Sequence, residues 1–380
     1  MSIHFHQLAI KEVRKETADC VSVAFIIPEN LKETFAFQPG QNITIRTTIN
    51  NEDIRRSYSI CSAPHENELR VAIKKVGGGL FSSFANSSLQ AGILLEVLPP
   101  TGNFNTKPDA LQTKQYLAFA AGSGITPVIS IIKTILQTEP HSSFTLVYGN
   151  RSRSSIIFFE ELEGLKNKFL QRFNFINILS REKTDASISF GRITADKLKV
   201  LSKLIQYAAM DEIFICGPEE MIFCVKDFLE QQGIEKKKIH FELFTVPGQK
   251  KSGVRSRELG VGSRELGVRS RELGVGSREL GVESGPKSKI TVKLDGRSFD
   301  FDLPFNSNIN ILDAALKQGA DLPFACKGGV CCNCKARLLE GEVEMDVHWG
   351  LEQEEIEKGY ILTCQSHPKT ERVSIDFDVK

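Results

Sequence analysis

The sequence predicts a multi-domain chain: first an antiparallel β-barrel, then an α/β domain with a parallel sheet, and last a small α+β domain. Three observations support this division. The chain has 380 residues, enough for two or three domains. Alternating strand-like segments fill the first hundred residues, and strands alternate with helical segments from Gln115 onward. A repeat of period seven then separates these parts from a short cysteine-rich region.

The first domain, residues 1–106, contains short segments in which polar and apolar residues alternate. Pro39-Gly40 and the run from Pro99 to Gly102 separate some of them, as turns between strands do. Many short strands with such turns are typical of an antiparallel barrel. The predicted strands are 20–27, 42–49, 57–62, 69–76 and 93–98.

In the second domain, residues 107–247, the pattern of apolar residues changes. Apolar strand-like segments are followed by helical ones, including a Pro-bearing segment after residue 121 and an acidic helix over 158–168. Strands that alternate with helices predict a parallel sheet covered on both faces. The predicted strands are 116–121, 144–150, 173–180 and 212–218.

The repeat SRELGV starts at Ser256, Ser263, Ser270 and Ser277. Its period of seven does not predict a coiled coil, because Leu and Val lie only two residues apart and give a helix no continuous apolar seam. Each repeat also carries glycine, which costs about 1 kcal/mol in a helix. Residues 248–286 are therefore predicted to be a low-complexity linker to the third domain, residues 287–380.

Charge and hydropathy exclude several classes of protein. The chain has 48 Lys and Arg against 47 Asp and Glu, so it offers no basic field for nucleic acid. The first residues show no secretory signal, and the most apolar stretch is interrupted by Gly122, Gly124 and Pro127. We therefore expect a soluble cytoplasmic protein with no membrane or nucleic-acid partner. The acidic run over 352–357 is expected to be a solvated helix face.

The cysteines carry the strongest chemical signal. Cys326, Cys331 and Cys334 have the spacing C-x4-C-x2-C, and Cys364 follows alone. This spacing is typical of plant-type [2Fe–2S] ligation, so these four thiols are the candidate ligands. Cys332 is then a spare, non-ligating cysteine.

Two glycines in the same loop, Gly328 and Gly329, would let backbone N–H groups approach the cluster sulfurs. The alternative is structural zinc. Zinc sites usually show two separated C-x2–4-C pairs, whereas three of the ligands here sit together.

Two segments of the first domain carry candidate residues for a phosphate-bearing cofactor. A polar tetrad, RSYS, lies on a predicted strand, and a glycine triplet at 77–79 opens a predicted helix. A glycine-rich helix N-terminus suits phosphate. RSYS alone is a weak signal, since a strand that only stabilises the barrel could carry it. The candidates are Arg56, Ser57, Tyr58, Ser59, Gly78, Gly79 and Ser82.

Three loops of the second domain follow predicted strands and should meet at one edge of the sheet. They contain the sequences AGSGITP, YGNR and CGPEEM. None is the GxGxxG fingerprint, but small residues at strand ends still let a dinucleotide approach the backbone. The candidate residues are Gly122, Gly124, Thr126, Arg151, Cys216, Gly217 and Pro218.

Arg151, Arg153 and Arg181 follow the second and third strands of this domain. No acid closes the strand that ends at Tyr148, where an NAD-specific site would need one for the ribose hydroxyls. This favours NADPH over NADH, although Arg153 could equally be a solvated surface charge.

These motifs resemble those of the ferredoxin–NADP reductase superfamily, whose RxYS, GxxS, GxGxTP and CGP segments match here, followed by a domain that resembles a plant-type ferredoxin of β-grasp fold. The resemblance implies that Arg56 pairs with a flavin pyrophosphate, that Tyr58 packs on the isoalloxazine and that Ser59 lies near its N5 atom. It also implies that Thr126 and Cys216 lie near the nicotinamide. Ser59 and Cys216 are thus the candidate catalytic residues, and Glu242 and Phe244 of HFELF could adjoin the flavin, although Phe244 could equally be core.

The order of the domains resembles the reductase components of multicomponent oxygenases, and RSYSICSAP and GGGLFSSFAN resemble the phenylacetyl-CoA epoxidase reductases. This implies electron transfer from NADPH through FAD, rather than FMN, and the [2Fe–2S] cluster to a diiron oxygenase subunit. An NADH-dependent reductase of a steroid or aromatic-ring hydroxylase is the alternative within the same class. A redox sensor or carrier without turnover is the alternative from another class.

Overall fold

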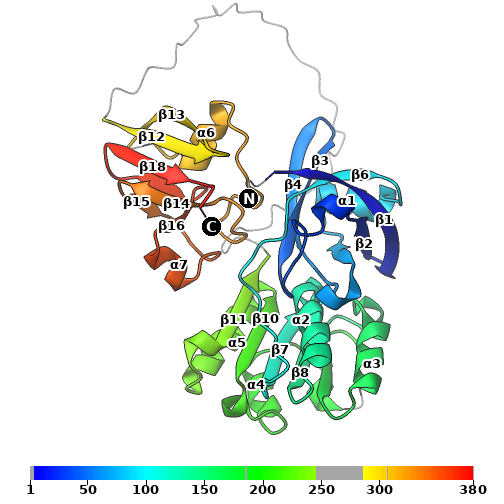
Figure 1. The fold of residues 1–380 in the computed structure, drawn as a ribbon. Coiled ribbons are helices and arrows are strands. Elements are labelled where there is room, and N and C mark those ends of the chain that lie inside the picture. The colour runs from blue at the N-terminus through cyan, green and yellow to red at the C-terminus, as the bar shows by residue number, and fades with distance from the viewer. Residues whose placement is uncertain (1–3, 185, 245–285, 306, 380) are drawn as a thin grey trace, which may run out of the picture.

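The computed structural model describes residues 4–184, 186–244, 286–305 and 307–379. Three sheets, each with its own helices, follow one another along the chain (Figure 1). The first body (blue to cyan) and the last (yellow to red) lie side by side above the second (green). The predicted order of barrel, α/β domain and α+β domain is confirmed. The predicted linker lies, apart from Pro286, outside the described residues.

The first sheet is an antiparallel barrel with strand order β4-β3-β6-β1-β2-β5. A bridge between Ile60 and Val71 joins the two ends of this order and closes the barrel. Helix α1 (Leu80–Ser88) lies between the last two strands in sequence. The strands are β1 (His6–Thr17), β2 (Cys20–Ile26), β3 (Asn42–Ile49), β4 (Glu52–Ser59), β5 (Leu69–Lys74) and β6 (Leu94–Val97).

Two features of the barrel differ from the prediction. The segment predicted as a strand over 57–62 is only the end of β4, which begins at Glu52. Strand β1 was not predicted, because charged residues occupy most of its outward positions and only a few apolar side chains, Leu8 and Ile10 among them, point into the core.

The second sheet is parallel, with order β11-β10-β7-β8-β9. The chain runs outward from β7 to β9 and then returns to the other side of β7, so the order reverses between β7 and β10. Ligands of such sheets bind outside the carboxyl ends of the strands at this reversal. The strands are β7 (Gln115–Ala121), β8 (Ser143–Asn150), β9 (Phe173–Leu179), β10 (Glu212–Gly217) and β11 (Ile239–Leu243). The helices are α2 (Ile125–Thr138), α3 (Phe159–Lys168), α4 (Ala195–Leu201) and α5 (Glu219–Gln231).

Helix α2 is buried almost all round, from Ile125 to Leu136. One side packs on the parallel sheet and the other on the barrel, and barrel residues Cys20, Cys61 and Ala72 belong to the same apolar cluster. A helix that is apolar on every side is stable only in such a position. A second apolar cluster covers the opposite face of the sheet under α4 and α5.

The third sheet is mixed, with order β13-β12-β18-β14-β16, and β12 runs parallel to β18. Helix α6 (Ile311–Lys317) packs on it around a separate apolar core. Residues 335–345 form two strands, because Gly341, at φ +84°, turns the chain between them. The elements are β12 (Lys287–Leu294), β13 (Arg297–Pro304), β14 (Lys335–Glu340), β15 (Val343–Met345), α7 (Gln353–Glu357), β16 (Tyr360–Leu362), β17 (Ser366–Pro368) and β18 (Arg372–Asp376).

Short 3-10 turns complete the described elements. They are η1 (Glu29–Leu31), η2 (Pro64–Glu66), η3 (Gly122–Gly124), η4 (Arg153–Ser155), η5 (Ser187–Ser189), η6 (Tyr207–Ala209) and η7 (Lys236–Lys238). None of the helices in the described ranges has both the length and the apolar character needed to cross a lipid bilayer.

Candidate functional site

The RSYS tetrad ends strand β4 beside the start of helix α1. The Tyr58 ring lies 5.5 Å from the ring of Phe81 in the first turn of that helix. Burial raises the pKa of Tyr58, so its hydroxyl stays protonated. Arg56 is exposed, and its guanidinium reaches the carbonyl of Arg55 at 2.7 Å. The fold thus brings the two sequence motifs of the first domain together.

The turn before α1 fits a phosphate group. Gly78 has φ +76°, which side chains rarely adopt, and no atom lies within 4 Å of where a Cβ of Gly77 or Gly78 would stand. Buried Ser82 holds the turn: its Oγ accepts from the N–H of Val76 at 3.1 Å and donates to the carbonyl of Gly79 at 3.3 Å. An open glycine backbone therefore adjoins a helix N-terminus, an arrangement that binds anions.

The three loops at the carboxyl edge of the parallel sheet meet as predicted. A Cβ at Gly124 would overlap the backbone carbonyl of Cys216, so two of the loops are in direct contact. The buried hydroxyl of Tyr148 donates to the carbonyl of Gly122 at 2.9 Å and fixes the third. Space remains open around Gly122, at φ +54°, beside the start of α2. This combination of close packing and open glycine backbone fits a dinucleotide.

A buried acid joins these loops to the barrel. Ser59 of β4 donates from Oγ to Oε2 of Glu242 at 3.1 Å, and Glu242 pairs with Cys216 across strands β11 and β10. Burial raises the pKa of Glu242 to about 8, and it also raises that of the Cys216 thiol. Both groups are therefore protonated at neutral pH. Phe244 is 42% exposed and does not belong to the core.

The four candidate cluster cysteines form two pairs. The Cys331 thiol donates to Cys326 and lowers the pKa of Cys326 to about 6, and the Cys334 thiol donates to Cys364 and lowers its pKa. Among the described residues, no three His, Cys, Asp or Glu side chains converge on a single ion position. Two pairs of thiols fit two irons with two protein ligands each, whereas tetrahedral zinc needs its ligands around one point.

The backbone of the cysteine loop also fits a cluster. The N–H of Gly328 points to the Cys326 sulfur at 3.3 Å. Gly329 has φ +73°, and a Cβ there would lie 2.7 Å from Cγ2 of Val347, so this position is too close-packed for a side chain. Cys332 points away from the pairs and donates from its thiol to the carbonyl of Gly350 at 2.5 Å.

The third domain contacts both other domains. Asn333, inside the loop, donates from Nδ2 to Oγ1 of Thr44 on β3 at 2.5 Å. Trp349 lies 5.8 Å from the ring of Phe223 on α5 and 6.5 Å from that of Phe241 on β11. These contacts seat the candidate cluster beside the RSYS strand and the nucleotide loops.

A buried arginine anchors the same interface. Arg55 on β4 is 7% exposed and forms an ion pair with Asp321 at 3.2 Å. Its guanidinium also donates to the carbonyl of Leu322 at 3.2 Å and stacks 4.2 Å from the ring centroid of Phe324. The Asp321 side chain is 71% exposed, so solvent screens the ion pair, and the hydrogen bond to Leu322 and the stacking on Phe324 make Arg55 an interdomain contact.

The sequence predicted a solvated helix face for the acidic run over 352–357, but one residue of this run contacts the segment that follows the barrel. Glu355 of α7 accepts from Lys335 at 2.6 Å and from Nδ2 of Asn103, in the segment after the barrel, also at 2.6 Å. It therefore forms a further interdomain contact. The acidic run over 352–357 predicted a helix, but not the contact between Glu355 and Asn103.

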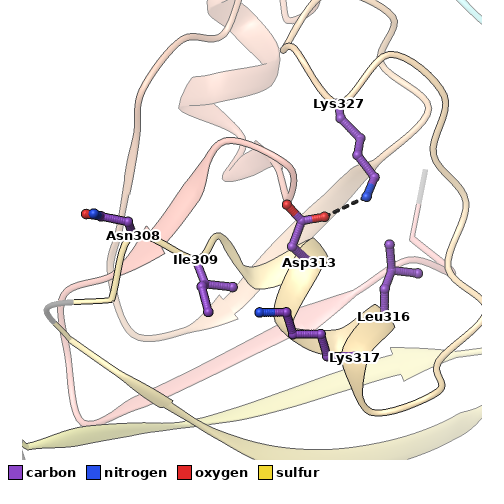
Figure 2. Close-up of a pocket in the computed structure, with 6 residues that line it drawn as sticks. All are labelled: Asn308, Ile309, Asp313, Leu316, Lys317 and Lys327. Atoms are coloured by element: carbon purple, nitrogen blue, oxygen red, sulfur yellow. Dashed lines mark hydrogen bonds and ion pairs between the residues drawn. The ribbon is translucent and has the colours of Figure 1, made fainter. Parts of the chain in front are cut away.

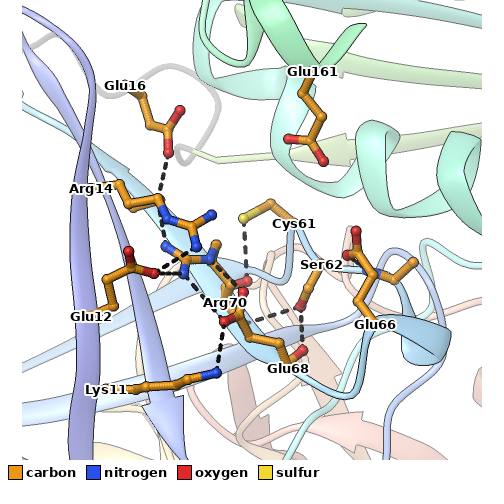
Figure 3. A network of polar contacts seen from close by, with 12 residues as sticks. Lys11, Glu12, Arg14, Glu16, Cys61, Ser62, Glu66, Glu68, Arg70 and Glu161 are labelled. Atoms are coloured by element: carbon orange, nitrogen blue, oxygen red, sulfur yellow. Dashed lines mark hydrogen bonds and ion pairs between the residues drawn. The ribbon is translucent and has the colours of Figure 1, made fainter. Parts of the chain in front are cut away.

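A charged network holds the segment that follows RSYS. Arg70 on β5 pairs with Glu12 at 2.6 Å and with Glu68 at 2.7 Å (Figure 3). Hydrogen bonds from Arg14 and then from Arg70 lower the pKa of Glu12 to about 2. The carbonyl of Arg70 accepts a hydrogen bond from the N–H of Cys61, and the N–H of Arg70 donates to the hydroxyl of Ser62. The network thereby fixes where β4 ends.

Two surface hollows lie outside the RSYS strand and the loops of the parallel sheet. One, of about 380 Å³, adjoins the cysteine loop, where Lys327 pairs with Asp313 at 2.7 Å (Figure 2). The other, of about 540 Å³, lies on the barrel beside β1 and α1. Neither is lined by a residue of the RSYS, GSGITP or CGP segments.

Comparison with known families decides what these sites are. The oxidoreductase FAD-binding domain matches residues 7–106, the oxidoreductase NAD-binding domain matches 119–227, and the 2Fe-2S iron-sulfur cluster binding domain matches 292–369. The E subunit of 1,2-phenylacetyl-CoA epoxidase from Escherichia coli (strain K12) is 41% identical over 378 residues, which cover 99% of this chain and 98% of that protein. The chain belongs to the ferredoxin reductase family with a C-terminal [2Fe–2S] domain. As a member of this family it is an oxidoreductase that binds FAD, NAD(P)H and a [2Fe–2S] cluster.

Other relatives of this reductase are also oxygenase components. The ferredoxin reductase component of 3-ketosteroid-9-alpha-monooxygenase from Rhodococcus rhodochrous is 32% identical over 97% of this chain and 96% of that protein. Among solved structures, phthalate dioxygenase reductase shares the fold over 98% of both chains, with a TM-score of 0.54 and 23% identity. The match to an iron–sulfur domain rules out the zinc alternative, and the FAD and NAD domains rule out a sensor or carrier without turnover.

Several residues of the site were not predicted. Thr44, Asn333 and Arg55 carry no motif, and their importance comes from contacts between segments far apart in the sequence. The one available signal was the position of Asn333 inside the cysteine loop, directly before the candidate ligand Cys334.

Proposed function

We propose that this reductase passes electrons from NADPH, through FAD and its [2Fe–2S] cluster, to a diiron oxygenase subunit that epoxidises phenylacetyl-CoA in the cytoplasm. The observation that carries the proposal is the 41% identity to the E subunit of 1,2-phenylacetyl-CoA epoxidase over almost the whole of both chains. The functional units would be residues 1–106, 107–247 and 287–380, with 248–286 as the linker.

When bound, FAD converts two-electron reduction by NADPH into the single-electron transfers that a [2Fe–2S] cluster requires. Arg56 would neutralise the flavin pyrophosphate through charge-assisted hydrogen bonds, and Tyr58 would pack on the ring system. Ser59, held by its hydrogen bond to Glu242, would place its hydroxyl near the N5 edge of the flavin. The backbone of Gly78 and Gly79 would hold the phosphates, and Ser82 would keep this turn in place.

The nucleotide would lie over the loops of the parallel sheet. Gly122 and Gly124 would leave room for it, and Thr126, whose hydroxyl is bonded to the carbonyl of Ser123 at 3.0 Å, would keep the loop in shape. The backbone of the Cys216-Gly217-Pro218 segment would border the nicotinamide and exclude water. Cys326, Cys331, Cys334 and Cys364 would ligate the cluster.

The test is reconstitution. The purified reductase, loaded with FAD and iron–sulfur cluster, is mixed with NADPH and with the oxygenase subunits of phenylacetyl-CoA epoxidase or of 3-ketosteroid-9-alpha-monooxygenase. We expect epoxide only with the first set, in proportion to NADPH oxidised. Hydroxylated steroid with no epoxide would overturn the proposed acceptor. Zinc in the thiol site and no flavin would overturn the proposal altogether.

The proposed role of Glu242 predicts a pH dependence. Its pKa is raised from 4.5 to about 8, so it ionises as the pH passes 8 and places a negative charge beside Ser59, where electrons arrive. We expect stopped-flow reduction of the flavin by NADPH to slow above pH 8, and Glu242→Gln to show a flat profile. The same pH step in the variant would contradict this role.

The raised pKa of Glu242 also has a consequence for stability. The folded protein binds this proton more tightly than the unfolded chain, so the contribution of the group is fully present below about pH 4.5 and is lost as the pH rises to about 8. Thermal unfolding should therefore show a smaller loss of stability over this range in Glu242→Gln than in the unmodified protein.

The coenzyme preference is proposed from three arginines. Arg151 and Arg181 adjoin through a backbone hydrogen bond of 2.8 Å, and the guanidinium of Arg153 lies over the ring of Phe159. Guanidinium groups at the ends of these strands suit the 2′-phosphate of NADPH. We expect the double variant Arg151→Gln/Arg153→Gln to lower kcat/KM for NADPH about tenfold or more and to leave that for NADH within about twofold, on the scale of one or two charge-assisted bonds. Equal losses with both coenzymes would contradict the assignment.

A further inference from the structure

We propose that Asn333 is a positioning residue that links the cluster loop to the flavin strand, by orienting the Ser57 hydroxyl through Thr44. The proposal rests on the proposed function, since it takes the flavin to lie at RSYS and the cluster at the four cysteines. It adds to that function a specific route by which the docked third domain acts on the flavin site.

The contact crosses from one domain to another at a buried point. Asn333 lies between Cys332 and Cys334 and is 5% exposed. Its Nδ2 donates to Oγ1 of Thr44, which is fully buried on β3, and Thr44 lies 2.9 Å from Oγ of Ser57 on the neighbouring strand β4. Three side chains thus connect the cysteine loop to the RSYS tetrad without a gap.

The donor and acceptor capacities of these groups limit how the chain can be arranged. Thr44 accepts from Nδ2 of Asn333 and keeps its single proton. Either hydroxyl can donate in the contact of 2.9 Å between Thr44 and Ser57. In the proposed arrangement Thr44 donates to Ser57, and half-buried Ser57 keeps its proton for the flavin. Asn333 favours this arrangement because it occupies a lone pair of Thr44 that could otherwise accept from Ser57.

Stability alone does not account for a buried asparagine here. Within the described chain, the Oδ1 atom of Asn333 is buried and has no hydrogen-bond partner, which carries a desolvation cost. Docking has other anchors: Arg55 with Asp321, Asn103 with Glu355, and Trp349 with Phe223. The third domain should therefore stay docked when the Asn333 contact is removed.

The experiment uses the holoprotein and three substitutions. Asn333→Leu removes the contact from the loop side, and Thr44→Val removes it from the barrel side without touching the cluster ligands. Asn103→Leu is the matched control, because it removes another asparagine hydrogen bond between domains, of 2.6 Å, away from the flavin strand. The flavin reduction by NADPH and the subsequent cluster reduction are followed separately by stopped-flow absorbance.

We expect flavin reduction by NADPH to stay within about twofold in Asn103→Leu, and to slow less than cluster reduction in Asn333→Leu and Thr44→Val. Cluster reduction should slow about tenfold in Asn333→Leu and in Thr44→Val, on the scale of one hydrogen bond, and no further in the double variant. Asn103→Leu should transfer electrons at the unmodified rate. Additive losses in the double variant, no loss in Thr44→Val, or an equal loss in Asn103→Leu would overturn the proposal.

Two readouts other than turnover separate this role from a structural one. Trp349 is the one tryptophan of the chain, so acrylamide quenching of its emission reports docking, and we expect it to be unchanged in Asn333→Leu. The midpoint potential of the flavin should shift in Asn333→Leu and Thr44→Val but not in Asn103→Leu. If acrylamide quenching of Trp349 increased and the flavin midpoint potential did not shift, Asn333 would be only a docking contact. If NADPH fails to reduce the flavin of the unmodified protein, the proposed function is overturned, and this proposal with it.

Discussion

Cys364→Ser is expected to abolish electron transfer beyond the flavin and to leave flavin reduction by NADPH intact. Cys364 is 2% exposed and pairs with Cys334, and its loss would leave one iron with a single thiolate ligand. Flavin reduction depends on the barrel and the parallel sheet, which this substitution does not touch. The measurement is iron content and the electron paramagnetic resonance signal of the reduced cluster, alongside stopped-flow reduction of the flavin.

Cys332→Ser is the matched control for that experiment. It lies in the loop that carries the other three candidate ligands and is also buried, but its thiol faces the carbonyl of Gly350 rather than another cysteine. A serine hydroxyl can donate to the same carbonyl, so we expect a full cluster and normal transfer. If Cys332→Ser lost the cluster and Cys364→Ser kept it, the assignment of the four ligands would be wrong.

Gly124→Ala is expected to have the largest effect in the α/β domain. Its Cβ would overlap the backbone carbonyl of Cys216 and crowd the N–H of Gly217, and neither of these backbone groups can move aside as a side chain could. The two loops must separate, at a cost of about 1–3 kcal/mol or more. We expect a lower midpoint for denaturant unfolding and a KM for NADPH raised about tenfold or more, because that separation distorts the proposed nucleotide site.

Gly164→Ala is the matched control, and we expect it to raise the stability rather than lower it. Gly164 lies within helix α3, and no atom stands within 4 Å of the position its Cβ would take. Alanine should therefore stabilise the helix by about 1 kcal/mol and leave the KM for NADPH unchanged. Equal behaviour of the two variants would show that the close approach of Gly124 to Cys216 does not matter.

Local patterns predicted the parts of the site that local chemistry determines. The spacing of Cys326, Cys331 and Cys334 follows from the need to wrap one loop around one cluster, so it is visible in a short window. The meeting of the GSGITP and CGP loops followed from a rule about parallel strands, and the close approach of Gly124 to Cys216 confirms it.

The seam between domains could not be predicted in this way. Thr44 and Asn333 are 289 positions apart, and Arg55 and Leu322 are 267 apart, so no periodicity or motif relates them. The partner of Glu355 was hidden for the same reason, because this residue looks like an ordinary surface acid until the fold brings Asn103 to it. The resemblance placed Glu242 and Ser59 near the flavin, but not the hydrogen bond between them. Tertiary docking, rather than propensity, decides such contacts.

The shared burial of helix α2 also bears on how such proteins can be recombined. Its apolar cluster takes in residues of both the barrel and the parallel sheet, and Lys133 on the same helix pairs with Glu66 and Glu161 on either side. The first two-thirds would therefore be inherited as an indivisible piece, whereas the third domain, with its own interior, is a cassette that gene fusion could add or exchange.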